Sequence, residues 1–457
     1  MNRRDFLKRS TKTSLGVAAG WTILNNPKSV RAAPANERVM LASVGVRGRG
    51  GNLAADFAVR PDCRIAYICD VDANLFPATV KRVAPIQGGA DPVCVQDFRK
   101  ALDDKNVDAI VVATPDHWHC LATILGCQAG KDVYVEKPLS HSAWEGRKAI
   151  EAARKYNRVV QVGMQNRSAP YVIAAKKYLD DSRLGKVHLC RVYDHKGGAE
   201  ALGNFPAEPD RDPPEGFDWD MWNGPAPEAR YNANCINHWH SLWRYAGGDM
   251  VNDAVHQLDI ARWLMGVEYP KSVYCTGGRF ADEGIAEAPD TQIANFELDN
   301  LLMTVEMTLY TPYMLKESPQ IRQSPTEHPY WPQNSTRVEI FGSEGFMVVI
   351  RHGGGWQVFL RPQREKPVLK DQDKGLFPDP EHKENFIQCI RSRELPNADV
   401  EKGHRSALWV HYANISLRTG GQKLKINPKT EDIIGNPEAT ALLKRTYRKP
   451  WVVPEVV

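Results

Sequence analysis

The chain has 457 residues and a mass of 51.3 kDa, which favours two domains over one. Apolar residues make up 42% and charged residues 25%, proportions that exclude a fibrous or wholly disordered protein. The net charge is +4, but residues 1–32 hold seven of the 59 basic residues and one of the 55 acids, so the remainder carries about −2. Residues 33–457 are therefore close to neutral, which argues against a nucleic-acid partner, because phosphate binding needs a clustered basic surface. No run approaches the roughly 20 apolar residues that span a bilayer, so we expect no membrane partner either.

Residues 1–32 have the three parts of an export signal. The paired arginines Arg3 and Arg4 precede a modestly apolar run over 15–24, and Val30-Arg31-Ala32 places small residues at a plausible cleavage site. The paired arginines resemble the twin-arginine signal of the route that exports folded proteins. We therefore expect a periplasmic or otherwise exported protein that engages the export machinery; an amphipathic N-terminal helix is the alternative.

The nine cysteines do not predict a disulfide framework. Their number is odd, no C-x-x-C occurs, and Cys69 and Cys275 lie inside strand-like runs. We expect buried, unpaired thiols, because a protein that folds before export need not depend on disulfides.

Residues 36–165 alternate between short apolar runs and longer amphipathic stretches. The runs predict strands at Val39–Val44, Arg64–Cys69, Ala109–Ala113, Asp132–Val135 and Val159–Val162. Helices are expected between them, including His119–Ala129 and Ala143–Tyr156. Continuous apolar strands separated by helices imply a doubly wound, parallel α/β sheet of the Rossmann type.

A glycine-rich turn, Gly45-Val46-Arg47-Gly48-Arg49-Gly50, follows the first expected strand. Such a turn brings backbone N–H groups and a helix N-terminus close to a pyrophosphate. In the usual G-x-G-x-x-G pattern, Arg47 occupies the second glycine position. Either the loop shifts to use Gly48, or Arg47 turns outward and pairs with phosphate. An ordinary tight turn is the alternative to a nucleotide site.

Two further strand ends support a dinucleotide site at the carboxyl edge of the sheet. Asp70 ends the second strand, where a carboxylate accepts hydrogen bonds from ribose hydroxyls and repels a 2′-phosphate, so NAD is favoured over NADP. A helix N-cap is the other interpretation of Asp70. Thr114, Pro115 and His119 follow the fourth strand at the same edge.

The fifth strand ends in Glu136-Lys137-Pro138, which completes an ordered series of motifs. The series consists of the glycine turn, Thr114 to His119, Glu136-Lys137-Pro138, Gly163-Met164-Gln165-Asn166 and Gly247–Asp259. It resembles the glucose–fructose oxidoreductase/inositol dehydrogenase/MocA (Gfo/Idh/MocA) family over essentially the whole mature chain. The resemblance implies an NAD(P)-dependent oxidoreductase in which Lys137 is catalytic. Glu136, Lys137 and Gln165 are expected to contact the cofactor, and Arg167 the substrate.

The residues support the same role for Lys137. A lysine at the carboxyl edge, fixed by the following proline, would face the nicotinamide end of a bound cofactor. Partial desolvation and a positive ring nearby favour the neutral amine, which could take the hydroxyl proton of a substrate. A surface lysine paired with Glu136 is the alternative.

His256 is the second candidate catalytic residue, in an expected helix over Met250–Met265. Asp259 lies one turn beyond and could orient its imidazole. The family's usual acid, four residues before this histidine, is Asn252 here, and an amide cannot exchange a proton. Either Asp253 substitutes for it, or Lys137 and His256 suffice and Asn252 binds substrate hydroxyls. A satisfied core histidine is the alternative.

Two aromatic segments, 213–225 and 238–245, suit the apolar faces and hydroxylated rims of sugar rings. We expect Trp243 and Arg244 to contact substrate; ordinary loop packing is the alternative for any single tryptophan. The pair His238 and His240, even with His256, is too weak a pattern to predict a metal.

The rest of the chain, 166–425, is expected to form an α+β domain with a large open sheet. Alternation in Phe296–Leu309 predicts antiparallel strands, as do runs at Val187–Tyr193, Val273–Phe280, Arg337–Phe341, Phe346–Ile350 and Trp356–Leu360. A late helix is expected over Val400–Leu417, and the tail 426–457 should pack back over the surface. The family resemblance adds that the open face of such a sheet mediates homo-oligomers.

The sequence therefore predicts hydride transfer between NAD and a hydroxyl of a sugar, sugar derivative or cyclitol. The first alternative is a glycoside lyase or hydrolase in which NAD is oxidised and reduced within one turnover. The second is a non-catalytic sugar-binding protein, suggested by Arg47 in the glycine turn.

Overall fold

A computed structural model of the chain describes residues 38–197, 204–360 and 367–457; the expected export signal lies outside them. The first part is a six-stranded parallel sheet in the order β3-β2-β1-β4-β5-β6. Its strands are β1 Val39–Val44, β2 Cys63–Cys69, β3 Val93–Val95, β4 Ala109–Val112, β5 Asp132–Val135 and β6 Val160–Val162. This is the predicted doubly wound sheet, and β1 and β4–β6 are almost completely buried, as their continuous apolar runs require.

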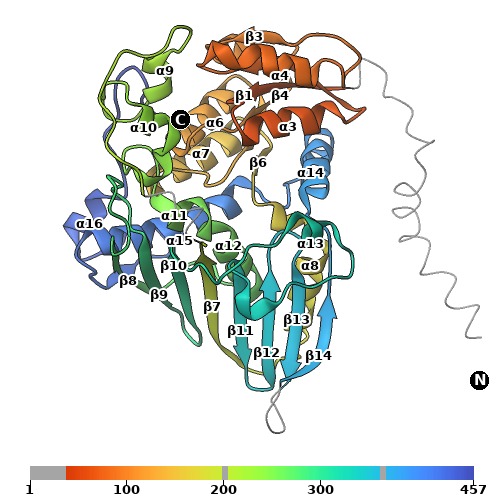
Figure 1. Cartoon of the computed structure of the whole chain (residues 1–457), viewed down its shortest axis with the longest axis vertical. Coiled ribbons are helices and arrows are strands. Elements are labelled where there is room, and N and C mark those ends of the chain that lie inside the picture. Colours follow the sequence, from red (N-terminus) through yellow and green to blue (C-terminus); the bar gives the residue numbers. More distant parts are fainter. Residues whose placement is uncertain (1–37, 198–203, 361–366) are drawn as a thin grey trace, which may run out of the picture.

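Helices join these strands on both faces of the sheet (Figure 1). They are α3 Arg49–Ala58, α4 Phe76–Val83, α5 Arg99–Asp103, α6 Asp116–Gln128 and α7 Ala143–Lys155, with the short η2 Ala73–Leu75. Helix α6 begins three residues earlier than expected, directly after Pro115, which is its N-cap residue in an extended conformation. The early start puts Asp116 in the first turn, at the carboxyl edge of the sheet.

The second sheet has ten strands in the order β14-β13-β12-β11-β7-β10-β9-β8-β15-β16. They are β7 Val187–His195, β8 Ser272–Gly278, β9 Thr291–Glu297, β10 Leu302–Thr308, β11 Arg337–Gly342, β12 Gly345–Ile350, β13 Gly355–Leu360, β14 Val368–Asp373, β15 Leu424–Ile426 and β16 Ile433–Ile434. Side chains alternate between buried and exposed along β9 and β10, which confirms a one-sided sheet. All neighbouring pairs are antiparallel except β7 and β10, which run parallel.

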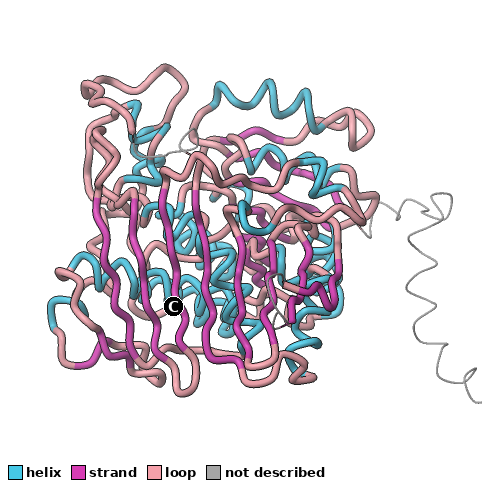
Figure 2. Tube along the Cα trace, turned by 60° about the horizontal axis from the view of Figure 1, so that its bottom comes forward, coloured by secondary structure: helices cyan, strands magenta, loops and turns pink. Residues whose placement is uncertain are grey.

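Helices cover one face of this sheet, and in the part of the chain described none covers the other (Figure 2). The helices of this part of the chain are α8 Pro170–Asp180, α9 Trp219–Asn223, α10 Ala233–Asn237, α11 Gly248–Asn252, α12 Ala254–Met265, α13 Pro319–Gln323, α14 Asp379–Ser392, α15 Val400–Arg418 and α16 Pro437–Ala441, with η3 Gln165–Ser168, η4 Trp239–Ser241 and η5 Trp331–Gln333. Helix α12 packs against β7, and α15 against β8. Among the described helices, none has the length and apolar character needed to cross a membrane.

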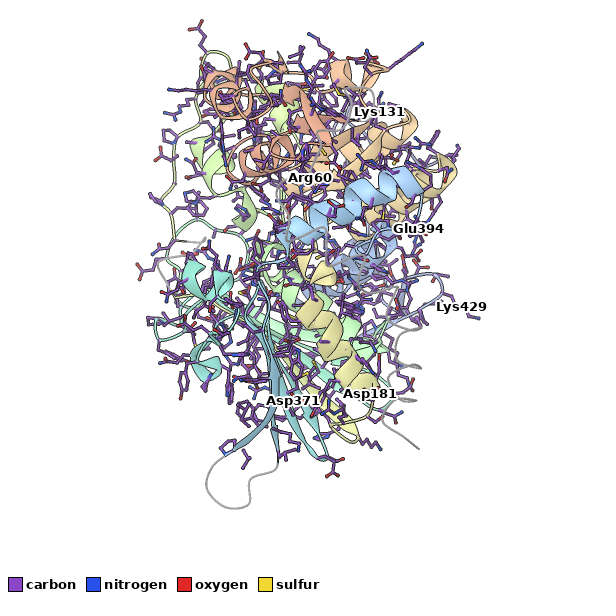
Figure 3. The ribbon with its side chains drawn as sticks, turned by 90° about the vertical axis from the view of Figure 1, so that its right-hand side faces the viewer. Arg60, Lys131, Asp181, Asp371, Glu394 and Lys429 are labelled. Atoms are coloured by element: carbon purple, nitrogen blue, oxygen red, sulfur yellow. The ribbon has the colours of Figure 1, made fainter. Side chains whose placement is uncertain are left out.

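Helix α14 fastens the second part of the chain to the Rossmann sheet. Figure 3 shows it beside Arg60, with Glu394 just past its end. In the described residues, five ion pairs join this helix and the residue that follows it to the first domain: Arg49–Asp379, Lys383–Asp56, Arg60–Glu384, Arg391–Asp62 and Arg393–Asp132. The C-terminal tail also returns to this domain, where Trp451 packs edge-on against Trp118 of α6 at 5.1 Å between ring centroids.

All nine cysteines are free, and all but Cys94 are buried. The expectation of unpaired thiols is confirmed. Burial among apolar side chains raises the pKa of the Cys63 thiol to about 12, so such thiols are unreactive.

Candidate active site

A cavity of about 430 Å³ lies at the carboxyl edge of the Rossmann sheet. One wall carries the glycine turn after β1 and the strand ends of β2, β4 and β5. The opposite wall comes from residues 217–240 and from Asn252. The ends of parallel strands are where open α/β sheets bind ligands. Of the predicted residues, it is lined by Gly45, Arg47, Gly48, Asp70, Thr114, Pro115, His119, Glu136, Lys137 and Asn252.

The glycine turn has the close approaches that a dinucleotide loop requires. Gly45 has a φ of +78°, and a Cβ there would lie 2.9 Å from the Ala113 carbonyl oxygen. A Cβ on Gly50 would lie 1.8 Å from the Gly45 carbonyl oxygen, so α3 can approach β1 only with glycine at this position.

Arg47, at the second glycine position, pairs with Asp72 at 3.0 Å, and its side chain is 58% exposed. Both residues line the cavity, so the ion pair holds the guanidinium beside the turn. Gly48, with a φ of +54°, ends the turn just before α3. The residues present therefore fit a pyrophosphate over the α3 N-terminus.

Asp70 lies directly after β2, with Oδ2 towards the glycine turn and Oδ1 towards Asp72. It accepts hydrogen bonds from the Val46 N–H at 2.7 Å and the Asp72 N–H at 3.0 Å, and burial raises its pKa. The N-cap considered for Asp70 belongs instead to Asp72, which accepts from the Asn74 N–H. Asp70 is thus free of a helix-capping role and faces the cavity, where a ribose would lie.

His119 joins the loops that follow β4 and β5. Its ring nitrogens lie 2.8 Å from the Thr114 carbonyl oxygen and 2.6 Å from that of Pro138. Gln165, by contrast, does not line the cavity. It is buried behind Glu136, where its amide donates to the Gly163 carbonyl and accepts from Arg49, each at 2.9 Å in the orientation that satisfies both ends. The expected cofactor contact of Gln165 is therefore indirect, through Arg49 and the strand end.

Lys137 extends across the cavity to the second part of the chain. Its Nζ donates to the main-chain oxygen of Asn252 and, over 3.0 Å, to its Oδ1. The Glu136 side chain is bonded to Arg49 instead: its Oε1 accepts from Arg49 Nε at 2.8 Å. The alternative of a Lys137–Glu136 surface pair is therefore wrong.

The expected helix over Met250–Met265 is divided in two at Asp253. Helix α11 ends at Asn252 and α12 begins at Ala254, with Asp253 at φ −120° and ψ −42° between them. Asn252 is therefore the last residue of α11, and its side chain contacts Lys137. His256 lies in the first turn of α12, only 6% exposed, and does not line the cavity.

His256 is nevertheless within the electrostatic reach of Lys137. Burial, followed by the positive charges of Lys137 and Arg351, lowers its imidazole pKa well below the usual value. It is therefore neutral near pH 7, and its ring packs edge-on against His352 at 5.0 Å. Among the described residues, no hydrogen-bond partner lies near His256 Nδ1.

Asp259 does not orient His256, contrary to expectation. Both of its oxygens accept from Arg167, at 2.7 to 2.9 Å, and Oδ1 also accepts from Ser406 at 2.6 Å. Arg167, expected at the substrate, does not line this cavity: it is 8% exposed, and its guanidinium is bonded to Asp259.

Asp253 does not replace the missing acid either. Arg351 binds its two oxygens, Lys196 contacts Oδ2, and these cations hold its pKa well below the ordinary value despite burial. A carboxylate held in this way cannot donate a proton, and its side chain does not line the cavity. Lys196 also lies 3.4 Å from both Asp194 and Asp249, so an ammonium already occupies this buried acidic group.

Trp243 and Arg244 lie outside the cavity, which corrects their expected substrate contact. Arg418 packs over the Trp243 ring at 5.0 Å, and Arg244 lies beside Tyr245. The aromatic wall is built instead by Phe217, Trp222, Trp239 and His240. These rings come from the two segments, 213–225 and 238–245, that the sequence predicted for sugar binding. Composition alone could not tell which of their rings face inward.

Asp116 is a cavity residue that the sequence did not reveal. It is 1% exposed, and burial raises its pKa to about 8, although the charge of Lys137 opposes the shift. Among the described residues, Oδ2 of Asp116 has no hydrogen-bond partner. A buried carboxyl with a raised pKa and a lysine lining the same cavity is typical of a functional site.

Replacing Asp116 with asparagine should stabilise the nucleotide-free protein increasingly as pH rises. The native carboxyl keeps a proton that the unfolded chain loses above about pH 4, so wild-type stability falls between pH 4 and 8, by up to about 1.4 kcal/mol per pH unit. Urea unfolding at pH 5, 6.5 and 8 measures the difference. Asp299→Asn, at a side chain 76% exposed, is the control; equal slopes for Asp116→Asn and wild type would contradict the assignment.

Three family models match most of the chain. Residues 28–164 match an oxidoreductase family, NAD-binding Rossmann fold; residues 222–348 match a GFO/IDH/MocA C-terminal domain; and residues 351–453 match an oxidoreductase family, C-terminal alpha/beta domain. The first match confirms the expected NAD-binding Rossmann domain.

Individual relatives are distant. The uncharacterised oxidoreductase YrbE of Bacillus subtilis is 26% identical over 56% of this chain, which spans 63% of that protein, under two-thirds of its length. Myo-inositol 2-dehydrogenase of Thermotoga maritima is 23% identical over 86% of this chain and 99% of its own. The WlbA dehydrogenase from Bordetella pertussis, solved with NADH and UDP-GlcNAcA, has a TM-score of 0.60 at 21% identity, covering 85% of this chain and 99% of its own. This likeness confirms the two-part fold.

Proposed function

Because this chain belongs to the Gfo/Idh/MocA oxidoreductase family, we propose that it is an NAD-dependent dehydrogenase acting on a hydroxyl of a sugar, sugar derivative or cyclitol. One observation carries the proposal. Lys137, which donates to both oxygens of Asn252, lines the same cavity as the Gly45–Gly50 turn. The two are the proton acceptor and the dinucleotide loop of a single site.

The arrangement of the site indicates which group accepts the hydride and which accepts the proton. A bound nicotinamide dinucleotide would supply the hydride acceptor. Lys137 takes the hydroxyl proton as the C–H bond of the same carbon breaks, so a secondary alcohol becomes a ketone and the amine becomes an ammonium. His256, being neutral near pH 7, can offer a hydrogen bond but does not supply a proton as imidazolium.

The substrate class is supported by the wall that faces Lys137. Trp239 and His240 stack at 3.5 Å between ring centroids, and both line the cavity. Burial and then the Lys137 charge lower the pKa of His240 to about 3, so this ring is neutral and suits an uncharged, hydroxylated ligand. Relatives named for inositol, and a structural neighbour solved with a sugar nucleotide, support the same class.

A panel of sugars and cyclitols, followed by absorbance of reduced nucleotide with NAD and separately with NADP, tests the proposal. We expect net reduction of NAD by at least one compound, with NADP much poorer because Asp70 repels a 2′-phosphate. Native mass spectrometry on the same preparation identifies any nucleotide that copurifies. No reduction with any compound, together with no bound nucleotide, would contradict the proposal.

A second candidate function, glycoside lysis with NAD cycling within one turnover, is favoured by the cover over the nucleotide end. The segment 213–240, here called the strap, is tied to the Rossmann domain. Gly216 O accepts from the Ala73 N–H and from Gln96 Nε2, each at 2.9 Å, and the Val71 carbonyl accepts from the Asp218 N–H at 2.9 Å. A nucleotide kept under the strap could serve many turnovers. Glycoside cleavage without accumulation of reduced nucleotide, in the panel above, would favour this candidate over the dehydrogenase.

We further propose export and self-association. The paired arginines Arg3 and Arg4 support export through the twin-arginine route, to the periplasm or beyond. The open face of the large sheet, which carries the exposed apolar side chains Tyr274, Ile293 and Leu302, supports a homo-oligomer (Figure 2).

A further inference from the structure

A chain of hydrogen bonds runs from Lys137 into the protein. Lys137 Nζ donates to both oxygens of Asn252, main-chain and Oδ1, and Asn252 Nδ2 donates to Asp249 Oδ1 at 3.0 Å. Asp249 is 3% exposed, and the Lys196 ammonium lies 3.4 Å from its other oxygen. The amide nitrogen of Asn252 can only donate and its oxygen can only accept, so the bonds to Asp249 and Lys137 fix the orientation of the amide. The nitrogen must face Asp249, and the oxygen must face Lys137.

This arrangement determines where the lone pair of the Lys137 amine points. A neutral amine has two N–H donors and one lone pair. With both donors directed to the oxygens of Asn252, the lone pair is left for the cavity, where a substrate hydroxyl would be. In the reverse direction the third N–H of the ammonium would donate to a substrate carbonyl.

Asp249 also accounts for the amide at position 252. An aspartate there would place two carboxylates about 3 Å apart, and such a pair must share a proton. Asparagine avoids this repulsion while still accepting from Lys137. Because the amide is neutral, it positions the amine without adding the negative charge that would hold it as ammonium.

We propose that Asp249 and Asn252 are positioning residues: Asp249 holds the Asn252 amide, and Asn252 aims the Lys137 lone pair at the substrate hydroxyl. The inference rests on the proposed function, because it deepens the role of Lys137 in that site. Neither residue transfers a proton itself. The proton passes from the substrate oxygen to Lys137 Nζ alone.

The variants Asp249→Ala, Asn252→Ala and the double variant test this coupling. Each single change should lower kcat about 10- to 100-fold, because the Lys137 amine is no longer oriented towards the substrate hydroxyl. KM should stay within about threefold of the wild-type value. The double variant should lose little more than either single variant, since both break one chain. Asp194→Asn is the matched control, because Asp194 lies 3.4 Å from the same Lys196 ammonium but bonds Gln257 rather than Asn252. It should leave kcat within about twofold of wild type.

A second readout does not require turnover. Competitive acetylation with acetic anhydride across a pH series, read by peptide mass spectrometry, reports where the Lys137 amine becomes neutral. Asn252→Ala removes the Oδ1 acceptor of Lys137, and Asp249→Ala removes the carboxylate that holds this acceptor in place. Both changes disfavour the ammonium, so both single variants should shift Lys137 labelling to lower pH. Exchanging acid and amide, Asp249→Asn with Asn252→Asp, should shift it upward by about 1 unit or more, because a carboxylate then contacts the amine. Asp194→Asn should not shift it.

The outcomes separate the inference from the function on which it rests. Wild-type kcat and wild-type labelling in Asp249→Ala, or losses that add in the double variant, would overturn the positioning role even in an active dehydrogenase. If wild type turns over no compound but labelling shifts as described, the positioning stands and the proposed reaction fails. Should Asp249→Ala not fold, Asn252→Ala and the exchange variant decide the question, because the labelling shifts of the two must have opposite signs.

Discussion

Lys137→Met should lower kcat by about 10³-fold while leaving nucleotide binding within a few-fold of wild type. The side chain keeps its length and its apolar stem, but the group that accepts the hydroxyl proton is gone. The lost amine contacts Asn252 rather than the glycine turn, so the dinucleotide loop is unchanged. Steady-state kinetics on the best compound of the panel, with nucleotide binding followed by calorimetry, provides the measurement.

Lys81→Met is the matched control, since Lys81 lies on the exposed surface of α4. It should retain wild-type kcat and nucleotide affinity. If Lys137→Met retained more than about a tenth of wild-type kcat, the amine would not be the proton acceptor, and the catalytic assignment would have to move to another cavity residue. Asp116 would be the first to examine.

Asp253→Asn should destabilise the folded protein by about 3 to 5 kcal/mol. The carboxylate is bonded to the 3%-exposed Arg351 and to the 4%-exposed Lys196. Its removal leaves the buried Arg351 without the carboxylate it binds, and leaves Lys196, among the described residues, only Asp194 and Asp249, each at 3.4 Å. Urea unfolding at pH 7 measures the loss. This prediction does not require that the intact ion pair adds net stability. The loss arises because removing one partner leaves a buried charge uncompensated.

Two further variants make this expectation specific. Arg351→Met combined with Asp253→Asn should recover part of the loss, because the uncompensated cation is then removed. Glu297→Gln breaks the surface pair with Lys423, whose side chains are half exposed, and should cost less than about 1 kcal/mol. A loss for Asp253→Asn as small as that for Glu297→Gln would show that the Arg351–Asp253–Lys196 group is solvated in solution.

The Rossmann half of the fold could be predicted because its information is local. Continuous apolar runs such as Val39–Val44 match a strand buried on both faces, and the predicted and observed bounds agree to within a few residues. The glycine turn and the Glu136-Lys137-Pro138 motif could likewise be recognised, because each consists of adjacent residues. Their ordered series also identified the family, and with it NAD.

The ion pairs of the second part could not be predicted from the sequence. Arg167 and Asp259 are 92 residues apart, and Asp253 and Arg351 are 98 apart, so no local pattern shows that each is occupied by the other. Each charge therefore looked available for substrate or catalysis. The inward-facing rings were ambiguous for a related reason, since the strap places Trp239 in the cavity and leaves Trp243 outside it.

The break between α11 and α12 shows the same limit on a smaller scale. Helical spacing over Met250–Met265 predicted one helix with Asn252 and His256 on one face. The structure interrupts it at Asp253, whose side chain is drawn to Arg351 and Lys196. These partners are distant in the sequence, so no local helical pattern could show where the helix is interrupted.

A crystal structure of the protein with NADH bound tests the central claim most directly. The account predicts the pyrophosphate over residues 45–50, the adenosine ribose at Asp70, and the nicotinamide ring beside Lys137 and Asn252. A nucleotide bound elsewhere, or a nicotinamide ring lying away from Lys137 Nζ with the amine turned out of the cavity, would contradict it.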